Sequence, residues 1–179
     1  TNLIGVKIST KKIDKMKATV INSNKEIFNS FYKALPFSLT NAQERVIKEI
    51  QDDMNKSRPM RRLVQGDVGS GKTVVAAGAM LTCAKNNLQS VLLCPTEVLA
   101  EQHFKNFSIW FASENIDIEI LTGKTKKKDW ERIDYDLRSG KIKILIGTHS
   151  VFQKRVSMKN LSLVVVDEQQ RFGVKQRFE

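Results

Sequence analysis

One stretch of the sequence combines glycine, lysine and threonine at a spacing that could bind phosphate groups. Residues 66–73 match the pattern G-x-x-x-x-G-K-[ST], which forms phosphate-binding loops. Glycines let successive backbone N–H groups approach phosphate oxygens without an intervening Cβ atom. We expect Lys72 to contact the β- and γ-phosphates of a nucleotide and the Thr73 hydroxyl to ligate Mg²⁺. The predicted nucleotide-binding residues of this loop are Gly66, Asp67, Val68, Gly69, Ser70, Gly71, Lys72 and Thr73.

A pair of adjacent acids offers a second piece of chemistry. Asp167 and Glu168 directly follow the apolar run 161–166. Asp167 fits a ligand that holds Mg²⁺ through its water shell, and Glu168 fits a base that orients or polarises an attacking water. An Asp-Glu pair after a strand is weak evidence by itself. Together with a phosphate loop, it favours nucleotide hydrolysis over binding alone, with Lys72 and Glu168 as the predicted catalytic residues.

The elements expected around these residues alternate between strands and helices. A helix is expected over 73–84, a second from Thr96 to about Trp110, and a third ending at about Arg138. This alternation predicts an α/β fold, a parallel sheet with helices on both faces, and polar residues cluster where its strands end, as at ligand sites of such sheets. The apolar runs that predict strands are 62–65, 90–94, 116–121, 142–146 and 161–166.

The segment before the phosphate loop has two parts. Residues 1–36 are polar and lysine-rich, with a short amphipathic helix plausible over 27–35, and we interpret them as a linker or the tail of a preceding domain. Thr40 is expected to cap a helix that ends near Met54. Phe37 could stack on adenine and Gln43 could pair with its edge, although the spacing alone is more typical of a capped surface helix with a core phenylalanine.

Composition sets bounds on the possible partners. The net charge is +11 and the pI is about 9.7, which suits a polyanionic partner. Lysine-rich codon usage would give the same excess of positive charge. No apolar run approaches the ~20 residues of a membrane span. Cys83 and Cys94 stand singly, which supports neither zinc nor a disulfide and fits a reducing cytoplasm, and His103 and His149 are too isolated to indicate a metal site.

Six segments together carry a more specific resemblance, to the superfamily-two helicases. They resemble the adenine-recognising Q motif (37–43), motif I (66–73), motif Ia (95–103), motif Ib (121–123), the motif that follows it (147–149) and motif II (167–170). With the tail 171–177, the sequence most resembles the RecG family of bacterial branch-migrating DNA helicases, over roughly residues 35–179. The resemblance implies a phosphate-loop NTPase with a RecA-like sheet, residues 37–179 forming the first RecA-like lobe.

The resemblance assigns further roles to named residues. It implies ATP and Mg²⁺ as cofactors, adenine contacts from Phe37 and Gln43, and contacts to DNA backbone phosphates from Thr96, Gly123 and Thr148. It also implies a double-stranded DNA translocase that remodels forks and branched junctions in recombination and repair. A second RecA-like lobe and a wedge domain of the same full-length chain would be its partners, in a bacterial cytoplasm without a membrane.

One position departs from the RecG pattern. RecG proteins typically have His where this chain has Gln170, a position expected to help couple the nucleotide site to the neighbouring lobe. Transcription-repair coupling factors (Mfd), a related family, have Gln there but usually Glu at the position of Gln169. Residues 37–40 and 95–97 favour RecG. Gln170 can form hydrogen bonds but cannot be protonated.

Three alternatives remain open at this stage. The first is the motor lobe of a transcription-repair coupling factor. The second is a phosphate-loop switch or small-molecule kinase, for which the sequence lacks an Asn-Lys-x-Asp guanine motif. The third is a DNA-binding module without activity. Because an arginine finger worth ~10³–10⁵ in rate is expected on a second lobe, the isolated 179 residues should bind Mg-ATP weakly and hardly hydrolyse it.

Overall fold

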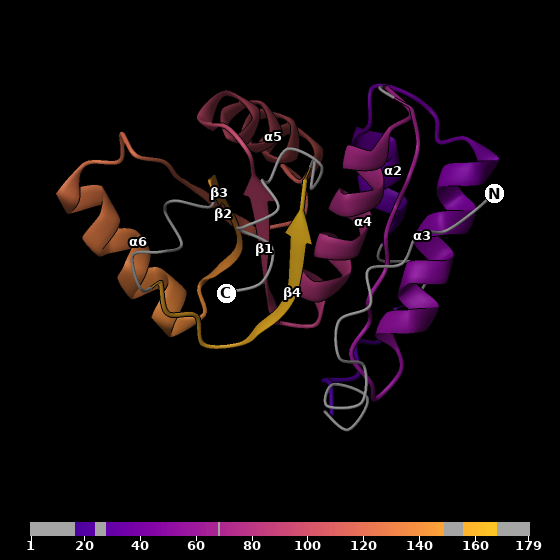
Figure 1. The fold of residues 1–179 in the computed structure, drawn as a ribbon, viewed down its shortest axis with the longest axis horizontal. Coiled ribbons are helices and arrows are strands. Elements are labelled where there is room, and N and C mark those ends of the chain that lie inside the picture. Colours follow the sequence, from indigo (N-terminus) through magenta and orange to yellow (C-terminus); the bar gives the residue numbers. More distant parts are fainter. Residues whose placement is uncertain (1–16, 24–27, 68, 149–155, 168–179) are drawn as a thin grey trace, which may run out of the picture.

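Helices and strands alternate over residues 72–148. The structure, a computed structural model, describes residues 17–23, 28–67, 69–148 and 156–167 (Figure 1). The elements are α2 (Asn29–Ala34), α3 (Asn41–Met54), α4 (Lys72–Lys85), β1 (Gln89–Cys94), α5 (Glu97–Trp110), β2 (Asp117–Leu121), α6 (Lys127–Ser139), β3 (Ile142–Thr148) and β4 (Leu161–Val166).

Within the described residues, four strands form one parallel sheet in the order β2-β3-β1-β4. Val91 of β1 lies opposite Leu145 of β3 on one side and Val164 of β4 on the other. All three pairings are parallel, so every strand ends at the same edge of the sheet. This edge, called the carboxyl edge below, is where open parallel sheets bind ligands. The α/β prediction is confirmed.

Helices cover both faces of the sheet. Successive side chains of a strand point to opposite faces. Leu92 and Cys94 belong to a core cluster with residues of α3, α4 and α5, while Val91 packs in a second cluster with Ile133 and Leu137 of α6. Two apolar layers therefore hold the sheet between them, as the predicted architecture requires.

The helix α4 brings the phosphate loop to the carboxyl edge. It consists mostly of small and branched apolar residues, and ten of its 14 residues are buried, so it is enclosed rather than amphipathic. Residues 86–88 connect its last residue, Lys85, directly to the start of β1, against which α4 packs. The helix therefore runs antiparallel to the strands. Figure 1 shows that α4 begins at the end of the sheet to which the β1 and β4 arrows point.

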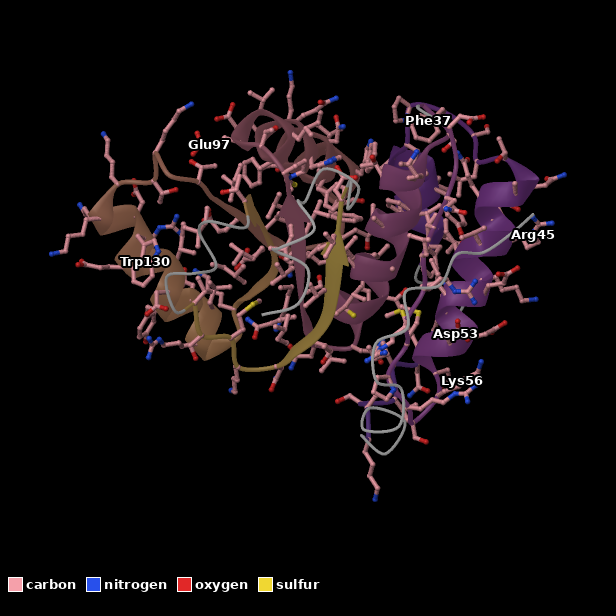
Figure 2. The ribbon with its side chains drawn as sticks, in the orientation of Figure 1. Phe37, Arg45, Asp53, Lys56, Glu97 and Trp130 are labelled. Carbon is pink, nitrogen blue, oxygen red and sulfur yellow. The ribbon has the colours of Figure 1, made fainter. Side chains whose placement is uncertain are left out.

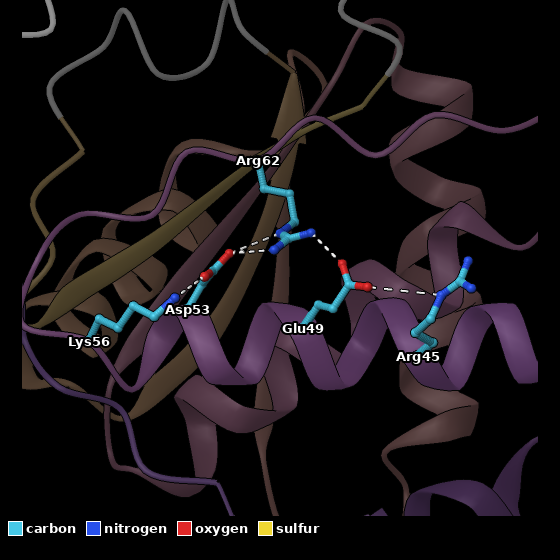
Figure 3. A network of polar contacts seen from close by, with 5 residues as sticks. All are labelled: Arg45, Glu49, Asp53, Lys56 and Arg62. Carbon is cyan, nitrogen blue, oxygen red and sulfur yellow. Dashed lines mark hydrogen bonds and ion pairs between the residues drawn. The ribbon is translucent and has the colours of Figure 1, made fainter. Parts of the chain in front are cut away.

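The strand predicted at 62–65 is wrong for this structure. Residues 61–67 carry no strand assignment, and within the described residues β4 pairs with β1 alone. Val164 and Val166 of β4 are 52% and 42% exposed. Arg62 of this segment instead contacts α3: its guanidinium bonds Asp53 and Glu49, as Figure 3 shows. These contacts hold the segment along α3, although its short apolar run would also suit a strand beside β4.

The amino-terminal part packs on the domain rather than lying apart from it. The expected short helix is confirmed as α2, which contacts α5. Ile21, Phe28, Phe31 and Leu35 belong to the main core cluster. Residues 1–16 lie outside the described residues, and the domain boundary at residue 36 stays a prediction. None of the helices in the described part of the chain has the length and hydropathy needed to span a bilayer.

Candidate nucleotide-binding site

The phosphate loop depends on its glycines. Gly69 and Gly71 have φ angles of +82° and +80°, a region that side-chain-bearing residues rarely adopt. A Cβ atom on Gly71 would lie 2.1 Å from Nε2 of Gln43, and one on Gly66 would lie 2.5 Å from Oγ of Ser70. A side chain at either position would therefore displace Gln43 or Ser70. Glycine at both leaves the loop's backbone able to approach a ligand closely. Val68 lies outside the described residues.

Lys72 places its positive charge inside the loop. Its Nζ atom donates hydrogen bonds to the carbonyl oxygens of Gly66 and Asp67, at 2.7 and 2.8 Å. Lys72 is also the first residue of α4, so its ammonium group lies near the N–H groups and positive dipole end of that helix. Thr73 follows in the same first turn. Together these groups favour an anion at the start of α4.

Gln43 joins the cap of α3 to the phosphate loop. Thr40 caps α3, and Gln43 completes a capping box: its N–H donates to Oγ1 of Thr40 at 3.2 Å, and its Oε1 accepts from the Thr40 N–H at 2.9 Å. The same amide donates from Nε2 to the carbonyl oxygen of Ser70 at 2.8 Å. The cap by Thr40 was expected from the sequence, whereas the role of Gln43 as its box partner was not. The structure places the predicted adenine-binding residue Gln43 directly against the loop.

Phe37 lies beside a surface cavity. Its ring is 44% exposed and meets the ring of Trp110 edge-on, with 6.2 Å between centroids. Figure 2 shows Phe37 at the end of the molecule to which the strands point. Burial raises the pKa of Tyr32 in this cavity, and the charge of Glu44 adds to the effect. The cavity measures about 450 Å³ and is lined by Tyr32, Leu35, Pro36, Phe37, Ser38, Leu39 and Glu44.

Asp167 lies at the carboxyl edge and is held from two directions. Its N–H donates to the carbonyl oxygen of Leu93 at 2.9 Å, which extends the pairing of β4 with β1 by one residue. Its Oδ2 lies 2.8 Å from Nε2 of His103 on α5. Burial raises the pKa of the nearby Cys94 thiol to about 12, and the charge of Asp167 adds to that shift.

The contact of His103 with Asp167 was not predicted from the sequence. The two residues of this contact are 64 positions apart, so no local sequence pattern predicts it. One signal was available: the buried residues of α5 are Ala100, His103, Phe107 and Trp110, so a histidine occupies the apolar stripe of the helix. Glu168, Gln170 and His149 lie outside the described residues.

The predicted DNA-contacting residues lie where three neighbouring strands end, at the carboxyl edge. Thr96 follows β1 and caps α5, accepting from the N–H of Leu99 at 3.3 Å. Gly123 follows β2, and Thr148 ends β3 opposite Cys94 of β1, where it is 6% exposed. The structure thus brings Thr96, Gly123 and Thr148 to one edge.

Glu97 links two of these positions. Its Oε1 accepts a hydrogen bond from the N–H of Gly123 at 2.7 Å, and its Oε2 lies 3.5 Å from Nζ of Lys124. Figure 2 shows Glu97 at the start of α5. The carboxylate therefore occupies the N–H of Gly123, one of the residues that the resemblance assigns to DNA phosphates.

Comparison with known proteins defines the class first. Residues 40–179 match the family model described as DEAD/DEAH box helicase, and the chain belongs to this family. The match covers the capped helix α3, the phosphate loop, all four strands and Asp167.

Within that class, the resemblance to RecG is confirmed. The chain is 47% identical over 161 residues to the ATP-dependent DNA helicase RecG of Synechocystis sp., a match that covers 90% of this chain and 19% of the relative. It is 50% identical over 147 residues to RecG of Haemophilus influenzae, covering 82% and 21%. The chain thus spans about a fifth of the length of these relatives.

The solved structures agree. A structure of RecG bound to a three-way DNA junction matches with a TM-score of 0.84 and 43% identity, over 91% of this chain and 22% of that one. The helicase MrfA bound to DNA and AMPPNP matches with a TM-score of 0.58 at 17% identity, over 85% and 22%, which supports the fold alone. These similarities favour RecG over the transcription-repair coupling factors.

Proposed function

We propose that this chain is the ATP-binding lobe of an ATP-dependent double-stranded DNA translocase that acts on replication forks and branched DNA. One observation carries the proposal: the phosphate loop, joined to Gln43, and Asp167 lie at the same edge of one parallel sheet. That arrangement suits a nucleoside triphosphate bound between Lys72 and Asp167. The similarity to ATP-dependent DNA helicases supports the choice of nucleotide and of nucleic acid.

The residues at this edge fit ATP and Mg²⁺. The tight glycine loop offers backbone N–H groups, and the Lys72 ammonium can exchange its two carbonyl partners for phosphate oxygens. The Thr73 hydroxyl and the Asp167 carboxylate are hard oxygen donors, the type that Mg²⁺ prefers. When bound, the metal ion supplies charge neutralisation at the phosphates. We assign Glu168 the task of orienting water and Gln170 that of coupling to a neighbouring lobe.

The same edge has a second set of groups suited to phosphates. Thr96 follows β1, Gly123 follows β2 and Thr148 ends β3, and we assign these three residues to the DNA backbone. Contacts of this kind position a duplex without discriminating its sequence. A net charge of +11 supports a polyanionic partner. The similar RecG structure contains a three-way DNA junction, which supports branched DNA as the substrate.

The proposal includes partners within the same polypeptide. A second RecA-like lobe would supply the arginine finger, and a wedge domain would contact the branch point of the DNA. The bacterial relatives support a bacterial protein, to which we assign a cytoplasmic location.

The test compares Lys72→Ala with the wild type in the full-length polypeptide. We expect the wild type to bind a fluorescent ATP analogue and to hydrolyse ATP faster with forked DNA. Lys72→Ala should lose both activities and keep its urea unfolding curve, because Lys72 bonds only its own loop among the contacts that the structure gives it. Lys48→Ala, at an exposed position of α3, serves as the matched control. Preference for GTP, or unchanged activity of Lys72→Ala, would overturn the proposal.

A further inference from the structure

We propose that His103 is a positioning residue, which holds the Asp167 carboxylate in the orientation that a metal ion requires. The inference rests on the proposed function in one respect, the assignment of Asp167 to Mg²⁺. Everything else in it comes from the contact between α5 and the end of β4: Nε2 of His103 lies 2.8 Å from Oδ2 of Asp167.

The contact is rigid on the side of His103. The residue is 7% exposed, lies on the buried stripe of α5, and packs against the ring of Phe107 with 6.3 Å between centroids. An imidazole enclosed in this way has few alternative rotamers. The hydrogen bond is therefore not a contact between two freely moving side chains, as at an exposed surface.

The carboxylate is fixed at its other end by the sheet. The N–H of Asp167 donates to Leu93 of β1, so the backbone position of Asp167 is set by β1 and its side-chain direction by α5. The Asp167 side chain is 24% exposed, so a hydrated ion can approach it from solvent. This is the arrangement expected of a ligand oriented by an outer partner.

The second ring nitrogen indicates which tautomer is present. Nδ1 of His103 is buried and has no hydrogen-bond partner among the described residues. A proton on Nδ1 would be a buried donor without an acceptor, whereas a bare Nδ1 leaves only an acceptor unpaired. The proton therefore belongs on Nε2, which donates it to Asp167. In this state the imidazole acts on the carboxylate and on no other polar group in the described structure.

A merely structural histidine would give a different result in experiment. If His103 only fills the core beside Phe107, its replacement lowers the stability of the fold and leaves the metal dependence of nucleotide binding unchanged. If it orients Asp167, its replacement weakens metal binding selectively. Removal of outer partners of this kind typically costs 10–100-fold in metal affinity.

The experiment measures binding of a fluorescent ADP analogue to the full-length polypeptide, without Mg²⁺ and across a Mg²⁺ titration. For His103→Leu we expect the half-saturating Mg²⁺ concentration to rise about tenfold or more. The affinity measured without Mg²⁺ should stay within about twofold of the wild type, because the phosphate loop is untouched. Gln102→Leu, at the adjacent exposed position of α5, is the control and should titrate like the wild type.

Two further variants keep the test decisive if His103→Leu does not fold. The amide nitrogen in His103→Gln reaches about as far as Nε2 and should restore the wild-type titration. The shorter side chain in His103→Asn has the same chemistry but not the reach, so it should resemble His103→Leu. Equal Mg²⁺ dependence in all variants would overturn the positioning role. Failure of the wild type itself to bind the nucleotide would instead overturn the proposed function.

Discussion

Gln43 donates a hydrogen bond from Nε2 to the carbonyl oxygen of Ser70, at 2.8 Å. The oxygen of the same amide accepts from the N–H of Thr40, so one side chain both caps α3 and contacts the phosphate loop. The cap uses Oε1 and the loop contact uses Nε2. A substitution can therefore remove one contact and keep the other.

We predict that Gln43→Glu keeps the cap and damages the loop contact. A carboxylate oxygen can still accept from Thr40, but it faces the Ser70 carbonyl with no donor. Nucleotide affinity should fall about tenfold, which corresponds to about 1.4 kcal/mol, with little change in unfolding. Gln43→Ala should lose both contacts and about 1 kcal/mol of stability as well. Calorimetric titration and urea unfolding would check this, and wild-type affinity in Gln43→Glu would contradict it.

Substitution of the two left-handed glycines should give unequal results. Alanine at either position costs about 1–2 kcal/mol because φ is near +80° at both. At Gly69 nothing lies within 4 Å of the new Cβ, so the backbone cost is the whole effect. At Gly71 the Cβ also displaces Gln43, 2.1 Å away. We expect Gly71→Ala to lose more stability in urea and to bind nucleotide more weakly than Gly69→Ala; equal losses would disprove the clash.

The Arg62 network should give a pH-dependent contribution to stability. Hydrogen bonds from Lys56 and Arg62 hold the pKa of Asp53 below its ordinary value of 3.8. A lowered folded-state pKa stabilises the fold above that ordinary value, and the contribution is lost as the pH falls through the lowered one. Arg62→Ala should therefore cost up to about 1 kcal/mol at pH 7, typical of exposed pairs, with the difference shrinking in strong acid.

The control for this network is Arg45, whose Nε lies 3.9 Å from Glu49 and whose side chain is 73% exposed (Figure 3). Arg45→Ala should change the free energy of unfolding by a few tenths of a kcal/mol or less. Urea unfolding from pH 7 to pH 2.5 would separate the two variants. A difference for Arg62→Ala that grows in acid would refute the assignment.

Neutralising Glu97 should strengthen DNA binding. Its carboxylate bonds the N–H of Gly123 and lies near Lys124, where a DNA phosphate would bind in the proposed function. Glu97→Gln keeps an acceptor for Gly123 and removes the negative charge. Fork affinity should rise severalfold at low salt, and the gain should narrow as salt screens the site. Fluorescence anisotropy would measure the fork affinity. The control is Glu101→Gln, whose carboxylate lies 4.0 Å from Lys124 and whose replacement should raise the fork affinity less. Weaker fork binding by Glu97→Gln would count against the prediction.

Local sequence patterns determined most of the fold. Continuous apolar runs predicted β1, β3 and β4 to within about two residues. For β1 and β3 the reason is burial, because buried parallel strands need apolar side chains on both faces. The run 62–65 does not form the predicted strand, because pairing with β4 depends on tertiary contacts and Arg62 pairs with acidic residues of α3 instead. A local sequence pattern cannot predict which of these two sets of contacts forms.

The candidate site was predictable where one motif contains it. The glycine loop and the start of α4 follow from eight consecutive residues. The contacts of Asp167 with His103 and of Gly123 with Glu97 join residues 64 and 26 positions apart, so the packing of α5 creates them. The capping box of Gln43 was within reach of the sequence, since glutamine serves that role as well as glutamate.

The elements of the lobe differ in how far they are shielded from solvent, and this affects where the lobe opens locally. The α4 helix and β3 are almost fully enclosed, whereas Val164 and Val166 of β4 remain half open to water. Backbone amides should exchange with deuterium slowly in α4 and fast in β4. Lys72 thus begins a helix whose amides should exchange slowly, whereas Asp167 directly follows the half-exposed strand β4.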